Sequence, residues 1–183
     1  MFKRLFLSVS ALAAALCIAP AACAQTPWPG AKPLTLIVPF SPGGNVDTTA
    51  RLVAQKLSER LNQSIIVDNV AGAGGVLGVA RATHAAPDGY TLVMGFDGPI
   101  SVARLINSAV KYDAEKDLTP VALVTTAPVV LLARPGLPVN NMDELIALAR
   151  AKPDTLTYAS SGVGTVLHLS CLLYTSPSPR DQR

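Results

Sequence analysis

The sequence predicts an α/β fold with a mostly parallel sheet, and three observations lead to that prediction. Short apolar runs alternate along the chain with stretches in which apolar residues recur at helical spacing. Turns rich in glycine and proline separate these segments. Two of the turns, at 41–45 and 160–165, stand between a strand-like run and a helix. Such alternation is typical of parallel sheets covered by helices.

The first unit is a strand, a glycine turn and the start of a helix. Leu34–Val38 is a short apolar run, and Pro39 ends it. A turn of small residues follows, made by Ser41, Gly43, Gly44 and Asn45. Apolar residues then recur at helical spacing at Val46, Ala50, Val53, Ala54, Leu57 and Leu61.

The start of this helix suits an anionic ligand group. The first N–H groups of a helix have no partner inside it, and the helix dipole places about half a positive charge there. Glycines in the turn expose those N–H groups. The pattern therefore favours a site for a carboxylate or a phosphate, although a single turn of this kind is also explained as a helix cap without a ligand.

The next elements continue the alternation. We expect strands at 64–69 and 90–95, joined through a glycine turn and a helix at 76–86. Residues 100–107 are expected to form a short helix. The polar run 111–117 is expected to be a solvated connection.

The chain beyond residue 120 is expected to begin a second lobe. Apolar runs at 121–126 and 129–133 predict two strands, split by Pro128. Either Asn141 or Asp143 is expected to cap a helix that continues through Arg150.

The strand–turn–helix pattern then returns near the end of the chain. Residues 156–159 predict a strand, and a helix is expected to open at Thr165. The turn between them is made by Ser160, Ser161, Gly162, Val163, Gly164 and Thr165. Ligands of parallel sheets bind at the carboxyl ends of strands, so the two turns together predict a two-sided clamp for an anion.

The first 24 residues have the pattern of a secretory signal. Lys3 and Arg4 form the charged start, an apolar stretch follows, and Ala22-Cys23-Ala24 resembles a cleavage site. The apolar stretch is short for a transmembrane helix. We expect the mature chain to begin near Gln25 and to lie outside the cytoplasm, with lipidation at Cys23 as an alternative.

Residues 171–183 do not continue the pattern that precedes them. The run CLLYTSPSPRD resembles the translation of a sequencing adapter, so we expect the natural protein sequence to stop near Ser170. A genuine tail rich in proline and serine is the alternative. We expect the domains to be a signal peptide at 1–24, a first lobe at 25–120, the start of a second lobe at 121–170 and this tail.

Charge and cysteine content exclude several kinds of function. Residues 25–170 contain 11 basic and 11 acidic residues, so the basic balance of the whole chain comes from its ends. That balance gives no indication of nucleic-acid binding or of attraction to an anionic membrane. No cysteine occurs between residues 25 and 170. An exported domain of this composition depends on burial and not on disulfides.

The motifs do not indicate catalysis or a cofactor. The glycines of 72–78 are spaced G-x-G-x-x-x-G and follow the second strand, so a tight strand-to-helix connection explains them better than a dinucleotide site. G-x-S-x-G is absent. The two histidines, His84 and His168, have no metal-ligand spacing with other residues. We therefore expect neither a metal nor another cofactor.

Two residues near the turns leave alternatives open. Asp47 is either an acid favoured by the helix N-terminus or a partner for an amino or hydroxyl group of the ligand. His168 lies one helical step after the second turn and either faces the ligand or serves the structure. Asp97 and Gly98 follow the third strand and are weaker candidates for the same edge.

The motifs also resemble a known family across residues 28–170. They include Trp28-Pro29-Gly30, LIVPFSPGGNVD at 36–47, GAGG at 72–75 and APDGYTL at 86–92. The run ELIALARAKPDTLTYASSGVGT at 144–165 and His168 complete the set. In this order they resemble the periplasmic substrate-binding proteins of tripartite tricarboxylate transporters, also called the Bug receptor family.

This resemblance implies a two-lobed, Venus-flytrap-like binding protein that captures a small carboxylate and delivers it to membrane permease subunits without altering it. It implies a monomer, and it implies that the ligand carboxylate sits between the two turns. The ligand-binding residues it implies are Ser41, Gly43, Gly44, Asn45, Asp47, Ser160, Ser161, Gly162, Gly164, Thr165 and His168. An exported enzyme acting on a small anion is the alternative.

The sequence departs from that family in length and at one turn position. Members are considerably longer than 25–170, so we expect the C-terminal half to be missing and the chain as written to be unstable, aggregation-prone and a weak binder. Asn45 stands where many members have glycine or another small residue, which affects ligand choice.

Overall fold

The computed structural model describes residues 27–153 and 155–175, with side chains through Leu173. The expected signal peptide and cleavage site at 1–24 lie outside the described residues, as does the tail from residue 176 onward.

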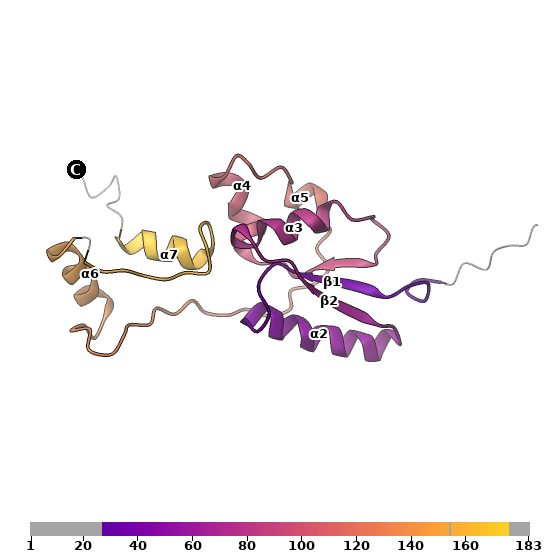
Figure 1. Cartoon of the computed structure of the whole chain (residues 1–183), viewed down its shortest axis with the longest axis horizontal. Helices are drawn as coiled ribbons and strands as arrows, with labels where there is room; N and C mark the ends of the chain where they lie inside the picture. Colours follow the sequence, from indigo (N-terminus) through magenta and orange to yellow (C-terminus); the bar gives the residue numbers. More distant parts are fainter. Residues whose placement is uncertain (1–26, 154, 176–183) are drawn as a thin grey trace, which may run out of the picture. The chain divides into compact units, whose positions relative to one another are not determined.

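A three-stranded parallel sheet forms the centre of the fold (Figure 1). Strand β1 (Leu34–Val38) lies between β2 (Ile65–Asn69) and β3 (Thr91–Val93). In this register Leu36 lies opposite both Val67 and Leu92. The α/β prediction with a parallel sheet is confirmed, as are all three strands. The last two are shorter than expected, because a strand extends only as far as its neighbour pairs with it.

Helices cover both faces of this sheet (Figure 1). Helix α2 (Asn45–Leu61) packs Ala50 and Ala54 against Leu36 and Val38. Helix α3 (Val76–Thr83) lies on the other face, where Val79 is fully buried. Both helices confirm the prediction, although α3 ends three residues earlier than the expected 76–86. Alternation of side chains along β1 makes this two-sided burial possible.

Shorter helices close the second face. A one-turn 3₁₀ helix, η1 (Ala73–Gly75), precedes α3, and a π-helical turn, η2 (Gly98–Val102), runs directly into α4 (Ala103–Ile106). The expected short helix at 100–107 is therefore confirmed.

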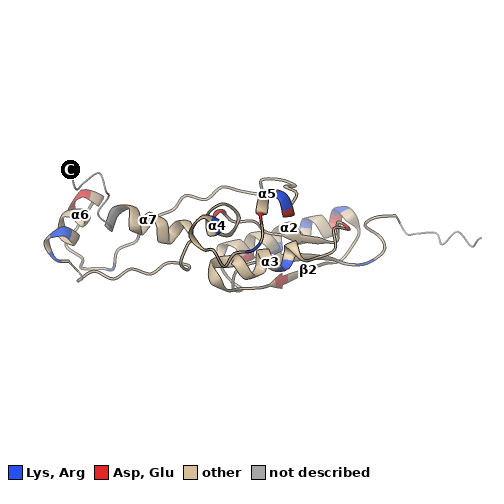
Figure 2. Ribbon diagram, turned by 90° about the horizontal axis from the view of Figure 1, so that it is seen from above, with Lys and Arg blue, Asp and Glu red and all other residues tan. Residues whose placement is uncertain are grey.

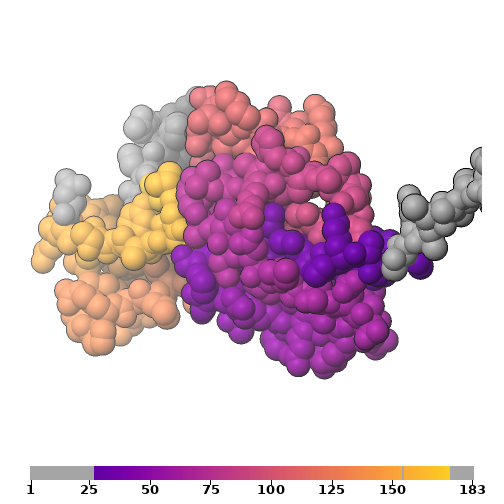
Figure 3. All heavy atoms as spheres, turned by 45° about the vertical axis from the view of Figure 1, so that its right-hand side comes forward, coloured from indigo at the N-terminus to yellow at the C-terminus, as the bar shows by residue number. Residues whose placement is uncertain are grey.

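The expectation of a purely solvated connection at 111–117 is wrong in part. Tyr112 is buried beside Val110, and its hydroxyl donates to the carbonyl oxygen of Pro99 at 2.6 Å. A single-turn helix, α5 (Ala114–Asp117), follows. Burial raises the pKa of the Tyr112 hydroxyl. Tyr112 belongs to the core cluster around α3 and α4, and Ala114 packs against that cluster. The polar composition of this run concealed both contacts. In the space-filling view, the purple and pink atoms of the sheet region pack closely together (Figure 3).

The chain after residue 118 contains helices but, among the described residues, no strand. The expected strands at 121–126, 129–133 and 156–159 are wrong. Val121, Leu123 and Leu132 are each more than 80% exposed, with relative exposures of 82%, 83% and 86%. A strand requires a hydrogen-bonded neighbour, and no described segment pairs with these runs.

The two helices of this part form where the sequence predicts them. Helix α6 (Met142–Ala151) begins after Asn141, whose side-chain oxygen accepts from the Glu144 N–H at 2.9 Å, so the first of the two expected caps is correct. On α6 the acidic residues Asp143 and Glu144 lie in the first turn and Arg150 lies in the last, so red and blue mark opposite ends of this helix (Figure 2). Helix α7 (Val166–Thr175) follows the second turn and continues past Ser170.

Candidate functional site

The first predicted turn lies at the carboxyl end of the central strand. Phe40 and Ser41 leave β1, and Gly44 is the N-cap of α2. Gly43 has φ +86°, a left-handed conformation that glycine adopts without steric cost. The sequence therefore places this turn correctly, directly before the unpaired N–H groups of a 17-residue helix.

The carboxylate of Asp47 stabilises this turn through hydrogen bonds. The residue is buried, with 3% relative exposure, and one carboxylate oxygen, Oδ2, accepts from the Gly43 N–H at 2.9 Å and from Arg51 Nε at 3.0 Å. The other oxygen, Oδ1, accepts from Asn69 Nδ2 at 2.9 Å. These partners favour the first of the two interpretations of Asp47, an acid that stabilises the helix N-terminus.

The same contacts stabilise the charged form of Asp47. The hydrogen bond from Arg51 is the largest cause, followed by those from Gly43 and Asn69, and together they lower the pKa of the Asp47 carboxyl to about 2. Asp47 is therefore an anion at every physiological pH. The Gly43 N–H therefore donates to an internal carboxylate, whereas the family resemblance implies that Gly43 binds the ligand.

The second predicted turn is held by its own hydrogen bonds. Thr165 is fully buried, and its hydroxyl donates to the Gly162 carbonyl oxygen at 2.7 Å. The Gly164 N–H donates to His168 Nδ1 at 3.3 Å, and the Gly162 N–H donates to Ser160 Oγ at 3.4 Å. His168 thus contacts the turn's main chain, which favours its structural interpretation.

The second turn also lies against two loops of the sheet region. A Cβ added at Gly74 would be 2.9 Å from the Val163 carbonyl oxygen, and one added at Gly162 would be 3.3 Å from Gly74 Cα. A Cβ added at Gly98 would be 3.1 Å from Thr165 Cα. Glycine at these positions permits close backbone-to-backbone contact, because a Cβ at Gly74 would force the Val163 carbonyl to shift and one at Gly98 or Gly162 would be tightly packed.

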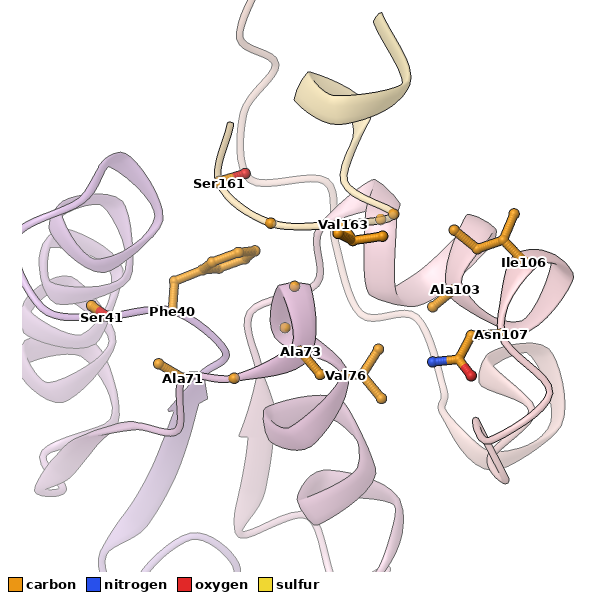
Figure 4. Close-up of a pocket in the computed structure, with 16 residues that line it drawn as sticks. Phe40, Ser41, Ala71, Ala73, Val76, Ala103, Ile106, Asn107, Ser161 and Val163 are labelled. Carbon is orange, nitrogen blue, oxygen red and sulfur yellow. The ribbon is translucent and has the colours of Figure 1, made fainter. Parts of the chain in front are cut away.

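A cavity of about 730 Å³ lies where these segments meet (Figure 4). Figure 4 shows Ser161 and Val163 on one side, Ala71, Ala73 and Val76 on the other, and the Phe40 ring between them. The full lining is Phe40, Ser41, Ala71, Gly72, Ala73, Gly74, Gly75, Val76, Gly98, Ala103, Ile106, Asn107, Ser161, Gly162, Val163 and Gly164.

The structure divides the predicted site residues into two groups. Residues from both turns line the cavity together, namely Ser41, Ser161, Gly162 and Gly164. The remainder lie beside or behind it, namely Gly43, Gly44, Asn45, Asp47, Ser160, Thr165 and His168. Several of this second group fix the turns through the hydrogen bonds described above.

Sequence reasoning missed the loop after β2 as part of the site. Five consecutive residues of this loop, 71–75, line the cavity, and Ala73 has φ +48°, which is uncommon outside glycine. The spacing of its glycines by itself predicts only a tight connection. Their position at the carboxyl end of a strand next to β1 was the available signal.

The cavity wall offers donors but no charge. None of its lining side chains is ionisable. Within the described chain, the main-chain N–H groups of Ala73, Gly74 and Ser161 donate to no other residue. Asn107 Oδ1 accepts from the Ala109 N–H at 2.9 Å, so its amide NH₂ is the donor at the other end. Phe40 packs edge-on against Phe96, with ring centroids 5.4 Å apart.

Two other features, a metal site and a membrane-spanning helix, are not found in the part of the chain that the structure describes. No group of three or more His, Cys, Asp or Glu side chains gathers there in a way that could hold a metal ion. No helix within 27–153 or 155–175 has the length and apolar character that crossing a bilayer requires.

Comparison with protein families identifies a match over most of the chain. Residues 49–176 match the tripartite tricarboxylate transporter family receptor. Among curated relatives, BugT of Bordetella pertussis is 38% identical over 145 residues, which are 79% of this chain and 44% of BugT. The chain therefore spans less than half the length of this relative.

Solved structures of similar proteins agree in fold. MatC from Rhodopseudomonas palustris with bound malate is 41% identical with a TM-score of 0.73, and 79% of this chain covers 49% of it. Rpa4515 of R. palustris with adipate is 35% identical with a TM-score of 0.67, and 80% of this chain covers 49% of it. The periplasmic binding protein BugD is 28% identical, with a TM-score of 0.68 at 80% and 50% coverage.

Proposed function

The chain belongs to the tripartite tricarboxylate transporter receptor family, and we propose that the protein is a periplasmic receptor that binds a small dicarboxylate. It delivers this ligand to membrane permease subunits and performs no chemistry on it. The expected signal peptide at 1–24 would export it, and it would act as a monomer. The malate and adipate in the structures of two relatives support the choice of ligand class.

The observation that carries this proposal is the uncharged cavity between the two glycine turns. Its walls combine apolar surface with main-chain N–H groups, serine hydroxyls and one amide. Fixed N–H donors bind a carboxylate strongly because charge-assisted hydrogen bonds are about twice as strong as neutral ones. A carboxylate between Ser41, Ser161 and the loop at 71–75 would exchange its hydration water for such donors.

The two ends of the ligand would meet different groups. We assign the first carboxylate to the donors of Ala73, Gly74 and Ser161, which have no other described partner. We assign the second to the amide NH₂ of Asn107, whose oxygen is already held by Ala109. The apolar stretch between them would contact Val76, Ala103 and Val163. This arrangement favours a short, flexible chain with an acceptor at each end.

Isothermal titration calorimetry with matched acids and amides tests this proposal. We expect malate and adipate to bind at least about tenfold more tightly than their neutral diamides, because only the acids form charge-assisted hydrogen bonds. Equal binding of acids and diamides would contradict a carboxylate receptor. Recovery of the ligand unchanged, checked by NMR after incubation, separates a receptor from an enzyme.

The role of the amide can be tested separately. Asn107→Leu should weaken adipate binding by about three- to tenfold, as expected for one hydrogen bond to a charged group. It should leave a monocarboxylate such as butyrate nearly unaffected. Asn140→Leu, on an exposed loop that does not line the cavity, is a matched control. Equal losses for both ligands would place the second carboxylate elsewhere.

A further inference from the structure

We propose that Arg51 masks the negative charge of Asp47 and thereby keeps the first turn favourable to an external carboxylate. Arg51 does not line the cavity, and its role is exerted through Asp47. This inference rests on the proposed function, because it concerns how the same site accepts an anion.

The need for masking follows from where Asp47 lies. Its carboxylate accepts the N–H of Gly43, which is two residues from the cavity residue Ser41. The charged carboxylate of Asp47 therefore lies next to a turn that is expected to bind the carboxylate of the ligand. Like charges this close disfavour each other. Without neutralisation, the field of Asp47 would repel a carboxylate bound between Ser41, Ser161 and the loop at 71–75.

Arg51 is positioned to supply that neutralisation. Its Nε lies 3.0 Å from Asp47 Oδ2, one turn further along α2, while its own side chain is 52% exposed. No lining side chain of the cavity is charged. The field at the turn therefore depends strongly on whether Asp47 is paired.

Asn69 fixes the geometry of this pair. Its Oδ1 accepts from Arg51 Nη2 at 3.1 Å, while its Nδ2 donates to Asp47 Oδ1 at 2.9 Å and to the Phe40 carbonyl oxygen at 3.1 Å. Asn69 ends β2, so the pair is tied to the neighbouring strand. The guanidinium is held over the carboxylate, and the same amide anchors Phe40, whose ring forms part of the cavity wall.

Replacement of Arg51 by glutamine tests the inference. At low salt we expect Arg51→Gln to weaken malate binding by about fivefold, since an unpaired charge then acts across a partly exposed site. Binding of the neutral diamide should be unchanged, and the loss should shrink at about 0.5 M salt because exposed charges are screened. Calorimetry measures both ligands.

Lys56→Gln is the matched control. Lys56 lies on the same helix and pairs with Glu59 at 2.8 Å, so its replacement also removes a positive charge from an ion pair on α2. It lies away from the turn, and malate affinity should change by less than about twofold. An equal loss in both variants would mean that net charge matters and pairing with Asp47 does not.

A second variant separates charge from structure. Asp47→Asn combined with Arg51→Gln removes both charges, and malate affinity should return to within about twofold of the original protein. Arg51→Lys, which keeps the charge, should also retain the preference for acids. A fall in diamide affinity together with malate affinity, or no recovery in the double variant, would show a purely structural role and overturn the inference.

Failure of the inference and failure of the proposed function give different results. If the unmodified protein prefers acids and Arg51→Gln leaves this preference intact, only the masking role is wrong. If the unmodified protein has no preference for acids over diamides, the proposed function is wrong, and the masking role of Arg51 is wrong as well.

Discussion

Residues 32–118 and residues 119–175 differ sharply in how much of their apolar surface is covered. In the first region, Leu34, Ile37 and Val38 are at most 2% exposed. In the second, Val121 and Leu132 are 82% and 86% exposed. Full burial of such a side chain stabilises a fold by about 1.5–3 kcal/mol. The buried strand residues therefore stabilise the first region, whereas the exposed apolar residues of the second contribute little to its stability.

The difference extends to the strand–turn–helix units of the two regions. β1 is paired on both sides before it enters the first turn, whereas residues 156–159 reach the second turn without a described partner. Both turns nevertheless form, and both are followed by a helix. Turns and helices depend on local hydrogen bonds, whereas strands depend on distant ones.

The largest expected effect comes from placing a charge in each region. Val38→Asp puts a carboxylate at a fully buried position and should cost about 4 kcal/mol or more, enough to unfold the sheet region. Val130→Asp, at a position that is 67% exposed, should change stability by less than about 0.5 kcal/mol. Urea denaturation followed by circular dichroism measures both, and similar losses would contradict the comparison.

A pair of glycine substitutions compares packing in the two regions. A Cβ at Gly78 of α3 would lie 2.7 Å from Pro39 Cα and 2.9 Å from the Val70 carbonyl oxygen, so Gly78→Ala should cost about 1–3 kcal/mol. Gly136 has φ +80° but nothing within 4 Å of an added Cβ, so its replacement by alanine should cost its own turn about 1 kcal/mol and change the global unfolding free energy less than Gly78→Ala does. A larger loss at Gly136 in the same denaturation experiment would reverse the comparison.

Contact between the two regions can be tested at Gly74. Gly74→Ala would place a Cβ 2.9 Å from the Val163 carbonyl oxygen and push the second turn away. Amide exchange at Leu169, whose N–H donates to Thr165, should then be about tenfold faster, which corresponds to about 1.4 kcal/mol.

Gly43→Ala is the control for the Gly74 experiment. Its φ of +86° gives a similar backbone strain, but no atom lies within 4 Å of an added Cβ. Exchange at Leu169 should therefore remain unchanged in this variant. Faster exchange in both variants would attribute the effect to backbone strain and not to the contact.

Acid should destabilise the first region in a specific pH window. The pKa of Asp47 is lowered from 3.8 to about 2, mainly by the Arg51 hydrogen bond, and hydrogen bonds from Lys32 and Arg104 lower the pKa values of Asp88 and Asp113. A lowered folded-state pKa means that this stabilisation is present above pH 3.8 and is lost as pH falls toward 2.

Denaturation midpoints measured across that window check this expectation. The urea midpoint should fall as the pH is lowered from about 5 to about 2, and the fall should be shallower in Asp47→Asn, which has no carboxyl to protonate. A midpoint that rises over this range would contradict the assigned role of the Asp47 contacts.

The smallest expected effect on the whole protein comes from the cap of α6. Asn141→Ala removes the acceptor of the Glu144 N–H and should destabilise this helix by about 1 kcal/mol. Because α6 contains no buried residue, the global denaturation midpoint should remain unchanged. Amide exchange within α6 should become faster, and an equal effect in α2 would show that the two regions unfold together.

The predictions from sequence succeeded where the signal is local. Helical spacing located α2, and the side chain of Asn141 located the start of α6. The glycines located both turns, because a left-handed conformation at Gly43 and Gly164 is favourable only for that residue type. The three strands of the sheet were also found, because their apolar runs do have paired neighbours within the described chain.

The predictions failed where the answer depends on distant contacts. Residues 121–126 have a strand's composition but no described neighbour, and Tyr112 lies in a polar run but is buried by α3 and α4. The role of the loop at 71–75 was missed because its glycines fit a tight connection equally well. Only the approach of Gly162 to Gly74 shows that this loop lines the cavity.

The sequence by itself determined helices α2, α3, α6 and α7, the glycine turns and the family of this protein, because these follow from short spacings along the chain. The tertiary structure decided which N–H groups remain available to a ligand. The Gly43 N–H donates to Asp47, and the Gly164 N–H donates to His168. Three other N–H groups have no partner in the described chain, namely those of Ala73, Gly74 and Ser161. A hydrogen bond depends on where two groups meet in space, and spacing in the sequence does not determine that position.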